Sequence, residues 1–407
     1  MTTTAAAQPT TTATAEDPAA EALRRSAVEL VPLLKEHAAR TEADRRIAEE
    51  NITALTEAGL FRLTVPRRFG GHEAGIRTFL EVTSELGRGC GSTAWVASLI
   101  NVCNWLVGLY PEQAQREVWG EDPGARVCGV LAPSATSRAV DGGLLVTGRW
   151  GFASGSLHSQ WAVLGVPVVD GSGRQTDQGC ALVPLTELTL EDTWYVAGMR
   201  GTGSNTLVAD EVFVPDHRIL SVTRATGGDY PTEHTGEALY RSALAPFLAL
   251  VLAGPQVGLA QGAMELVKAS LAKGKGISYT FYERASEAPS TQIQMAEAAM
   301  LIDTARLHML RAADDIDRWA ASGQYMPFAT RARVRMDTGY VARRSREAID
   351  LLLSVQGAGS FAEAGPLQRI WRDQETGSRH AVINPAVASE LYGRALLGIE
   401  EQVTPLI

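Results

Sequence analysis

Apolar residues recur three and four positions apart in the first part of the chain, which is the spacing of an amphipathic helix. This pattern covers residues 21–60, where Gly59 ends it, and residues 76–109, where glycines near 87–91 interrupt it. Charged residues fill the remaining helix positions of the first stretch. The pattern therefore predicts an all-helical N-terminal domain over residues 21–124.

Short apolar runs separated by turn residues replace this pattern over residues 125–222. Two of the runs flank residues 141–143, Asp-Gly-Gly, a sequence that is typical of a hairpin tip. Strands that are so short and so regularly spaced indicate a β-sandwich or barrel. A polar linker is expected over residues 223–239.

Helical periodicity returns over residues 240–407. Four long helices in succession are typical of an up-down bundle. The chain is therefore expected to be mostly α-helical with a central β-domain. The candidate helices are residues 241–273, 290–322, 328–354 and 378–402.

The composition narrows the function class. The net charge of −9 argues against nucleic-acid binding, which needs a basic surface. Residues 1–20 are rich in Thr and Ala, lack the regions of a secretory signal, and are expected to form a disordered tail. The most apolar run, residues 243–260, is broken by prolines and a glycine, so no membrane span is expected. The four cysteines form no CxxC pair, which indicates neither a metal site nor a disulfide framework, and we expect a cytoplasmic protein: Cys90, Cys103, Cys128 and Cys180.

Residues 148–161, GRWGFASGSLHSQW, alternate large and small side chains at strand period. Trp150, Phe152 and Ser154 are expected on one face of the strand, and small residues on the other. Small residues let a flat ring approach the backbone, and a serine hydroxyl can bond the polar edge of such a ring. An ordinary sandwich strand explains the same pattern equally well from these residues alone.

The order of helices, β-domain and bundle resembles the acyl-CoA dehydrogenase fold. Several motifs carry this resemblance across nearly the whole chain, and the run at 198–204 is the most specific. They are Leu60-Phe61, Val65-Pro66, Phe69-Gly70-Gly71, Gly91-Ser92-Thr93-Ala94-Trp95, GMRGTGS at 198–204 with VFVP at 212–215, Gln356-Gly357-Ala358-Gly359, and Arg372-Asp373.

One position decides which branch of the superfamily the chain resembles. Common acyl-CoA dehydrogenases have a glutamate base a few residues after the Arg-Asp pair, whereas this chain has His380 in that place and no acid between His380 and Glu390. The histidine is similar to that of the two-component flavin-dependent monooxygenases, which include oxygenases of 4-hydroxyphenylacetate, dibenzothiophene, indole and amino sugars. The resemblance implies reduced flavin, FADH2 or FMNH2, delivered by a separate flavin reductase. It also implies molecular oxygen, a flavin C4a-hydroperoxide, and oxygen transfer to a small-molecule substrate.

The resemblance also implies roles for individual residues. Ser154 matches the serine that faces flavin N5, and His380 matches the histidine near C4a; imidazole titrates near neutral pH and suits a proton donor and acceptor. A histidine at a helix start is also a common cap, and a glycine-rich loop is also a common tight turn. A salt-bridged helix face explains Arg369 as well as a phosphate contact does. The implied cofactor-binding residues are Trp150, Phe152, Ala153, Ser154, Gly203, Ser204, Arg369, Gln356 and Gly357.

The helix expected at residues 91–110 carries the candidate substrate pocket. Cys103 stands where phenol-hydroxylating members place a histidine, and a thiol is a weak hydrogen-bond partner. Asn101 and Trp105 on this helix, with His158, then line a pocket for an indole-like or polycyclic aromatic ring; core packing is the rival interpretation for Cys103 and Trp105. The alternatives are an amino-sugar N-oxygenase, an acyl-CoA dehydrogenase and a non-catalytic scaffold. The resemblance further implies a homotetramer or homodimer.

Overall fold

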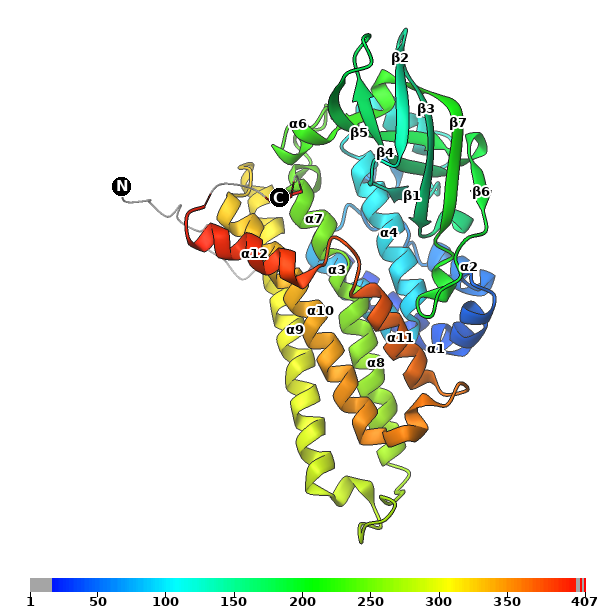
Figure 1. The fold of residues 1–407 in the computed structure, drawn as a ribbon, viewed down its shortest axis with the longest axis vertical. Coiled ribbons are helices and arrows are strands. Elements are labelled where there is room, and N and C mark those ends of the chain that lie inside the picture. Colours follow the sequence, from blue (N-terminus) through cyan, green and yellow to red (C-terminus); the bar gives the residue numbers. More distant parts are fainter. Residues whose placement is uncertain (1–16, 400–402, 405) are drawn as a thin grey trace.

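The computed structural model describes residues 17–399, 403–404 and 406–407, and it has three parts (Figure 1). In sequence, the β-domain lies between an N-terminal group of helices and a C-terminal helical domain, which confirms the expected fold class. The N-terminal helices are α1 (Pro18–Ala43), α2 (Glu49–Glu57), α3 (Ile76–Gly89), α4 (Gly91–Val107) and α5 (Glu112–Trp119).

The first helix begins inside the expected tail. Pro18 occupies its first turn, where a missing N–H costs nothing, and the Asp17 carboxylate accepts the N–H of Ala19 at 3.0 Å. The rest of the expected tail lies outside the described residues. The helical stretch expected over residues 21–60 is two helices, because the chain turns at Arg45, whose φ is +53°.

The β-domain is a sandwich of two four-stranded sheets, in the strand orders β1-β4-β5-β8 and β2-β3-β7-β6. All the pairs are antiparallel except β1 with β4. The apolar faces of the two sheets pack on each other and form a core of their own. The strands are β1 (Val127–Val130), β2 (Ala135–Val140), β3 (Gly143–Ala153), β4 (Trp161–Val169), β5 (Gln175–Pro184), β6 (Thr189–Glu191), β7 (Asn205–Pro215) and β8 (Ile219–Ser221).

The end of β3 does not follow the expected alternation. The register with β7 shifts between Trp150 and Ala153, and Phe152 has φ +65°. This bulge turns both Trp150 and Ala153 into the sandwich core and leaves Phe152 72% exposed. The prediction that Trp150, Phe152 and Ser154 share one face is therefore wrong, because an extra residue in the strand reverses the alternation.

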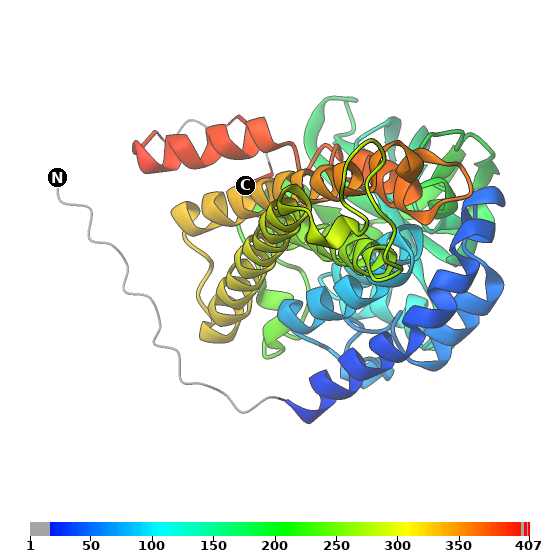
Figure 2. The ribbon, with the colours of Figure 1, turned by 90° about the horizontal axis from the view of Figure 1, so that it is seen from below.

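The C-terminal domain is built on an up-down arrangement of α8, α9, α10 and α11 (Figure 1). Seen along the bundle, α12 lies outside α10 and away from the other helices (Figure 2). A short helix, α6 (Val222–Thr226), occupies part of the expected linker. The C-terminal helices are α7 (Leu244–Leu250), α8 (Ala253–Leu271), α9 (Pro289–Ser322), α10 (Phe328–Gln356), α11 (Pro366–Gly377) and α12 (Pro385–Leu396).

The helix expected over residues 378–402 is wrong. The chain is non-helical at residues 378–384, between α11 and α12. Pro385 starts α12, and the Asn384 side chain caps it by accepting the N–H of Ala386 at 3.0 Å. The helix within this range therefore starts at Pro385, later than the apolar spacing predicted.

Two helices are buried through most of their surface. The stretch Leu244–Leu271 is long and apolar enough to cross a membrane, but 89% of its most apolar window is buried inside the protein, so it is a core element. Helix α4 is buried at every position except Leu99. It lies between the β-domain, α3 and α8, and it is the element around which the three parts meet (Figure 1).

Trp150 and Phe152 give a matched test of the bulge. Trp150→Ala is expected to lower the free energy of unfolding by about 3–5 kcal/mol, because it empties the sandwich core. Phe152→Ala is expected to change it by less than about 1 kcal/mol, because this ring is on the surface. Chemical denaturation of both variants measures the difference, and equal losses would contradict the observed register.

Candidate active site

Ser154 follows the bulge and is held against helix α4. The next residue, Gly155, has φ +80°, and a Cβ built on it would lie 3.2 Å from the side chain of Ile100 and 3.4 Å from that of Val96. A side chain at residue 155 would therefore collide with α4 and strain the backbone. The glycine predicted from the sequence as a turn residue thus brings Ser154 beside the first turns of α4.

Three buried hydroxyl groups form a chain at this point. The Ser154 Oγ lies 2.6 Å from the Ser204 Oγ, and the Ser204 Oγ lies 2.6 Å from the Thr202 Oγ1. Thr202 in turn donates to the carbonyl oxygen of Met199 at 2.8 Å. The structure therefore brings Ser154, Ser204 and the intervening Gly203 together, as expected for the loop at residues 198–204.

Phe152 presents an exposed ring next to these hydroxyls. Its ring meets the edge of Trp194, with the centroids 5.5 Å apart, and the Trp194 indole N–H donates to the Met199 carbonyl at 2.9 Å. A left-handed backbone at a non-glycine residue costs about 1–3 kcal/mol and persists where the surroundings impose it, often at binding sites. An uncovered aromatic ring beside an ordered hydroxyl pair fits a flat ligand with a polar edge, and so fits a flavin ring.

His380 lies in the loop after α11 and reaches α4 from the other side. Its ring meets the edge of Trp95, with the centroids 5.9 Å apart. Burial and the charge of Arg335 lower the pKa of His380 to about 4, so the ring is neutral at neutral pH. The Val382 N–H donates to the Nδ1 atom at 3.3 Å, which places the single ring proton on Nε2. His380 therefore offers an N–H donor.

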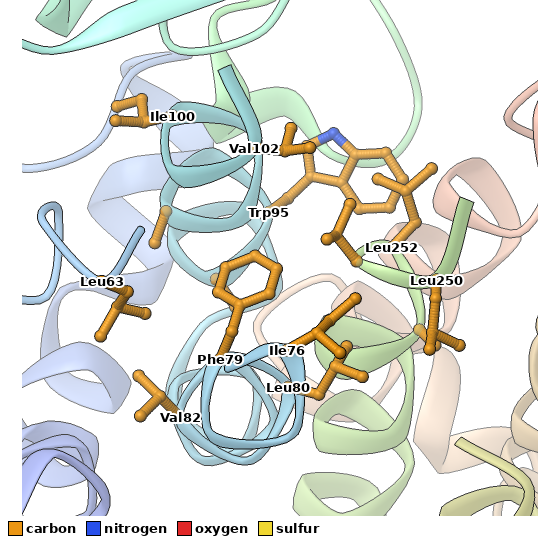
Figure 3. Close-up of a cluster of buried hydrophobic side chains, with 14 of the residues drawn as sticks. Leu63, Ile76, Phe79, Leu80, Val82, Trp95, Ile100, Val102, Leu250 and Leu252 are labelled. Carbon is orange, nitrogen blue, oxygen red and sulfur yellow. The ribbon is translucent and has the colours of Figure 1, made fainter. Parts of the chain in front are cut away.

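His380 and Gly155, the residue after Ser154, thus both lie against the first half of α4. His380 meets Trp95, and Gly155 lies beside Val96 and Ile100. Trp95 itself belongs to the apolar cluster with Leu250 and Leu252 (Figure 3). Trp95 and Trp194 were not predicted as site residues, because their partners are distant in the chain.

Arg335 on α10 is an unusual neighbour of His380. It is 3% exposed, and its Nε and Nη1 atoms are buried with no hydrogen-bond partner among the described residues. Burial lowers the pKa of Arg335 to about 10. The positive charge of Arg335 disfavours protonation of His380. Arg335 was not predicted as a site residue from the sequence.

Four expected site residues have packing roles instead. Trp150 donates its indole N–H to the Gly165 carbonyl at 2.9 Å inside the sandwich core, so it cannot contact a bound ring. Asn101 uses its whole amide group on the backbone of residues 60, 63 and 97. Trp105 is buried and stacked on Phe247. The buried Cys103 thiol lies against the backbone of Gly129, and none of these side chains lines an open pocket.

His158 stays a candidate. It lies in the short turn after Ser154, and it is buried with an Nε2 atom that has no partner among the described residues. Burial and the guanidinium groups of Arg46 and Arg126 lower the pKa of His158 to about 4. An unsatisfied buried nitrogen needs a partner, which water or a ligand can supply.

The remaining expected cofactor residues lie apart from Ser154. Arg369 lines a cavity of about 160 Å³ and sits 4.0 Å from the Glu42 carboxylate. Gln356 ends α10 and accepts a hydrogen bond from Ser270 at 2.9 Å. Gly357 follows it, with φ +67°. Within one chain, this end of α10 is at the tip of the bundle, far from the β-domain (Figure 1).

Comparison with known proteins places the chain in a family. The models of the acyl-CoA dehydrogenase N-terminal and C-terminal domains match residues 17–122 and 250–385. The chain is 37% identical to the oxygenase subunit HsaA of a flavin-dependent monooxygenase of Mycobacterium tuberculosis, over 91% of this chain and 94% of that protein. It is 34% identical to the oxygenase component of an FADH2-dependent resorcinol hydroxylase of a Rhizobium species, over 90% and 92%.

Solved structures agree with this assignment. The structure of 3-HSA hydroxylase from Rhodococcus superimposes with a TM-score of 0.89 at 35% identity, covering 95% of this chain and 98% of that one. XiaF from a Streptomyces species, solved with FADH2 and glycerol, gives a TM-score of 0.88 at 34% identity, with 95% and 97% covered. The chain therefore belongs to the oxygenase components of two-component flavin-dependent monooxygenases, which have the acyl-CoA dehydrogenase fold.

Proposed function

We propose that this chain hydroxylates an aromatic or heteroaromatic small molecule, using molecular oxygen and reduced flavin, FADH2 or FMNH2, from a separate reductase. The observation that carries the proposal is that neutral His380 meets Trp95 of α4, while Gly155, the residue after Ser154, lies beside Val96 of the same helix. Relatives named for resorcinol, p-hydroxyphenylacetate and indole-3-acetate support an aromatic substrate.

The flavin would be held at the end of β3. The exposed Phe152 ring would cover part of its flat face, and the Ser154 hydroxyl would bond its polar edge. Bound reduced flavin would supply the reducing electrons that activate oxygen for insertion into the substrate. The apolar cluster around Trp95 would keep bulk water away from the reacting groups (Figure 3).

His380 would control a proton at the substrate. As a neutral imidazole it donates a hydrogen bond from Nε2, and an aromatic hydroxyl or ring N–H can exchange a proton with such a group. Arg335 opposes the charged form of the ring and so keeps His380 a neutral hydrogen-bond donor.

An indole-like or polycyclic ring is the proposed substrate class. The wall beside His380 is the Trp95 indole. Such a wall favours a large apolar ring.

The alternative reactions have less support from the site. Proton abstraction by an acyl-CoA dehydrogenase needs a free carboxylate near residue 380, but Glu390 lies on α12 and is paired with Arg394 at 3.0 Å. Holding the ammonium of an amino sugar also needs an acid. The buried Asp373 on α11 instead accepts the Met199 N–H.

A homo-oligomer would complete the site. Ile293, Met300 and Leu307 are exposed and seven residues apart on α9, so they form one apolar stripe. We propose a homotetramer or homodimer in which Gln356 and Gly357 of a second copy reach the flavin. Exposed apolar stripes on helices are typical of surfaces that another chain covers.

Single-turnover reactions test the function. Wild-type protein with chemically reduced flavin, oxygen and an indole or phenol panel is expected to form hydroxylated product. His380→Ala should lower the rate of product formation about a hundredfold, the usual worth of a positioned acid or base. Ser154→Ala should divert flavin oxidation to hydrogen peroxide. His217→Ala, on the surface beside Glu117, is the control and should match wild type. Absence of product from the whole panel, or full activity of His380→Ala, would contradict the proposal.

The pH dependence of stability tests the neutral state of His380. The unfolded chain protonates this residue near pH 6.5, whereas burial keeps the folded pKa at about 4. The free energy of unfolding should therefore fall as the pH drops from about 6.5 to about 4. In His380→Asn, the loss of stability between about pH 7 and about pH 5 should be smaller than in wild type. An unchanged loss, measured by chemical denaturation, would show that the ring is charged in the folded protein.

Sedimentation velocity tests the assembly. Met300→Glu combined with Leu307→Glu should convert the wild-type oligomer to a smaller species, because each buried charge in the interface is unfavourable. The same variant should bind flavin more weakly. A wild-type protein that sediments as a monomer would rule out the proposed contribution of a second copy.

A further inference from the structure

The loop at residues 198–204 is fixed tightly to its surroundings. A Cβ built on Gly198 would lie 2.0 Å from the carbonyl oxygen of Arg372 on α11. A Cβ on Gly201 would lie 2.3 Å from the Thr41 side chain and 3.1 Å from the Cβ of Ser92 on α4. The loop backbone is thus in direct contact with three helices, and only glycine permits this approach.

Asp373 on α11 bonds the strained residue of this loop. Its Oδ1 accepts the Met199 N–H at 2.6 Å, and Met199 has φ +55°. Asp373 is only 6% exposed, and its Oδ2 lies 3.2 Å from a Cβ built on Gly91 at the start of α4. Burial and the nearby Glu42 raise the pKa of Asp373 to about 6, so at neutral pH it is a carboxylate that only accepts.

The Met199 carbonyl then sets the direction of the hydroxyl chain. A carbonyl can only accept, so the Thr202 hydroxyl proton is used on Met199. The Ser204 hydroxyl must therefore donate to Thr202, and Ser154 must donate to Ser204. With its one proton used in this way, the Ser154 Oγ has only lone pairs left for a ligand.

We propose that Asp373 is a positioning residue: by holding the Met199 turn, it orients the Thr202–Ser204–Ser154 chain so that Ser154 is a hydrogen-bond acceptor for the cofactor. The inference rests on the proposed function in that the ligand is a flavin. Reduced flavin carries an N–H at N5, where oxidised flavin has only a lone pair. An accepting serine beside that edge therefore favours the reduced form.

The same carboxylate also ties the two sides of the site together. Helix α11 leads directly into the loop that holds His380, and a Cβ built on Gly377 at its end would lie 3.1 Å from the Met199 side chain. That Cβ would lie 3.2 Å from the Trp95 ring. By fixing Met199 to α11, Asp373 thus also holds the Ser154 side and the His380 side of the site in place relative to each other.

Flavin binding to the purified full-length protein tests the direction of the hydrogen bonds among Thr202, Ser204 and Ser154. The quantity is the preference for reduced flavin, the Kd for oxidised flavin divided by the Kd for reduced flavin, measured anaerobically by fluorescence. Thr202→Val removes the last hydroxyl group of the Thr202–Ser204–Ser154 series. The preference for reduced flavin should then fall about threefold to tenfold, which is the effect expected from the loss of one hydrogen bond. Asp373→Leu should lower it to a similar extent, and Asp373→Asn, which keeps an acceptor oxygen, should restore it.

Amide hydrogen exchange provides a readout that needs no flavin. Asp373→Leu should raise exchange at the 198–204 loop about tenfold or more, since a hydrogen bond to a charged group is lost. Thr202→Val should leave the Met199 amide protected. The matched control is Asp317→Leu on α9, which removes a partly buried carboxylate that accepts two backbone N–H groups, of Ile76 and Arg77. This control should lower overall stability without changing the loop or the flavin preference.

The outcomes distinguish a failure of the proposed role of Asp373 from a failure of the proposed function. Wild-type flavin preference in Thr202→Val would overturn the assigned direction, and an Asp373→Asn variant that behaves like Asp373→Leu would show that charge, not the acceptor, matters. If Asp373→Leu does not fold, Thr202→Val and Asp373→Asn still decide. A wild-type chain that binds no flavin would instead overturn the proposed function, while the exchange measurements would still test the link between Asp373 and the loop.

Discussion

The burial of α4 is the constraint on which the rest of the structure depends. In a helix buried at nearly every position, a polar side chain without a hydrogen-bond partner costs free energy. Asn101 therefore bonds the backbone of the segment before α3, which fixes that irregular stretch without help from a sheet. The neighbours of α4 must also approach closely, which explains glycine at residues 91, 155 and 201. The proposed active site lies where His380 meets Trp95 and Gly155 lies beside Val96.

Charge is distributed around this helix in an uneven way. His380 is neutral, and the Nε and Nη1 atoms of Arg335 are buried without a hydrogen-bond partner among the described residues. Asp373 is a buried carboxylate that accepts a backbone N–H. Each of these states costs free energy that a well-packed apolar side chain would avoid. Such groups concentrate at sites that bind or react, because ligand contacts offset part of the cost.

Sequence periodicity predicted the fold because the helices and strands follow local rules. The helices expected at residues 290–322 and 328–354 begin and end close to α9 and α10, and the hairpin at 141–143 joins β2 and β3. Two predictions failed at single residues. A bulge at Phe152 reversed the faces of β3, and the last helix starts at Pro385 instead of residue 378. Neither event changes the apolar spacing, so the pattern alone cannot reveal it.

Only the site residues that stand in sequence motifs could be predicted from the sequence. Ser154, Ser204 and His380 stand in recognisable runs, whereas Asn101 and Trp105 were given to a pocket because polar and aromatic residues on a helix look alike whether they pack or bind. Hydrogen-bond direction is harder still, since the orientation of Ser154 depends on a carbonyl at residue 199 and a carboxylate at residue 373. A serine that accepts and a serine that donates have the same letter in the sequence. What distinguishes them is the group at the end of the hydrogen-bonded series. Here that group is the Met199 carbonyl, which cannot donate.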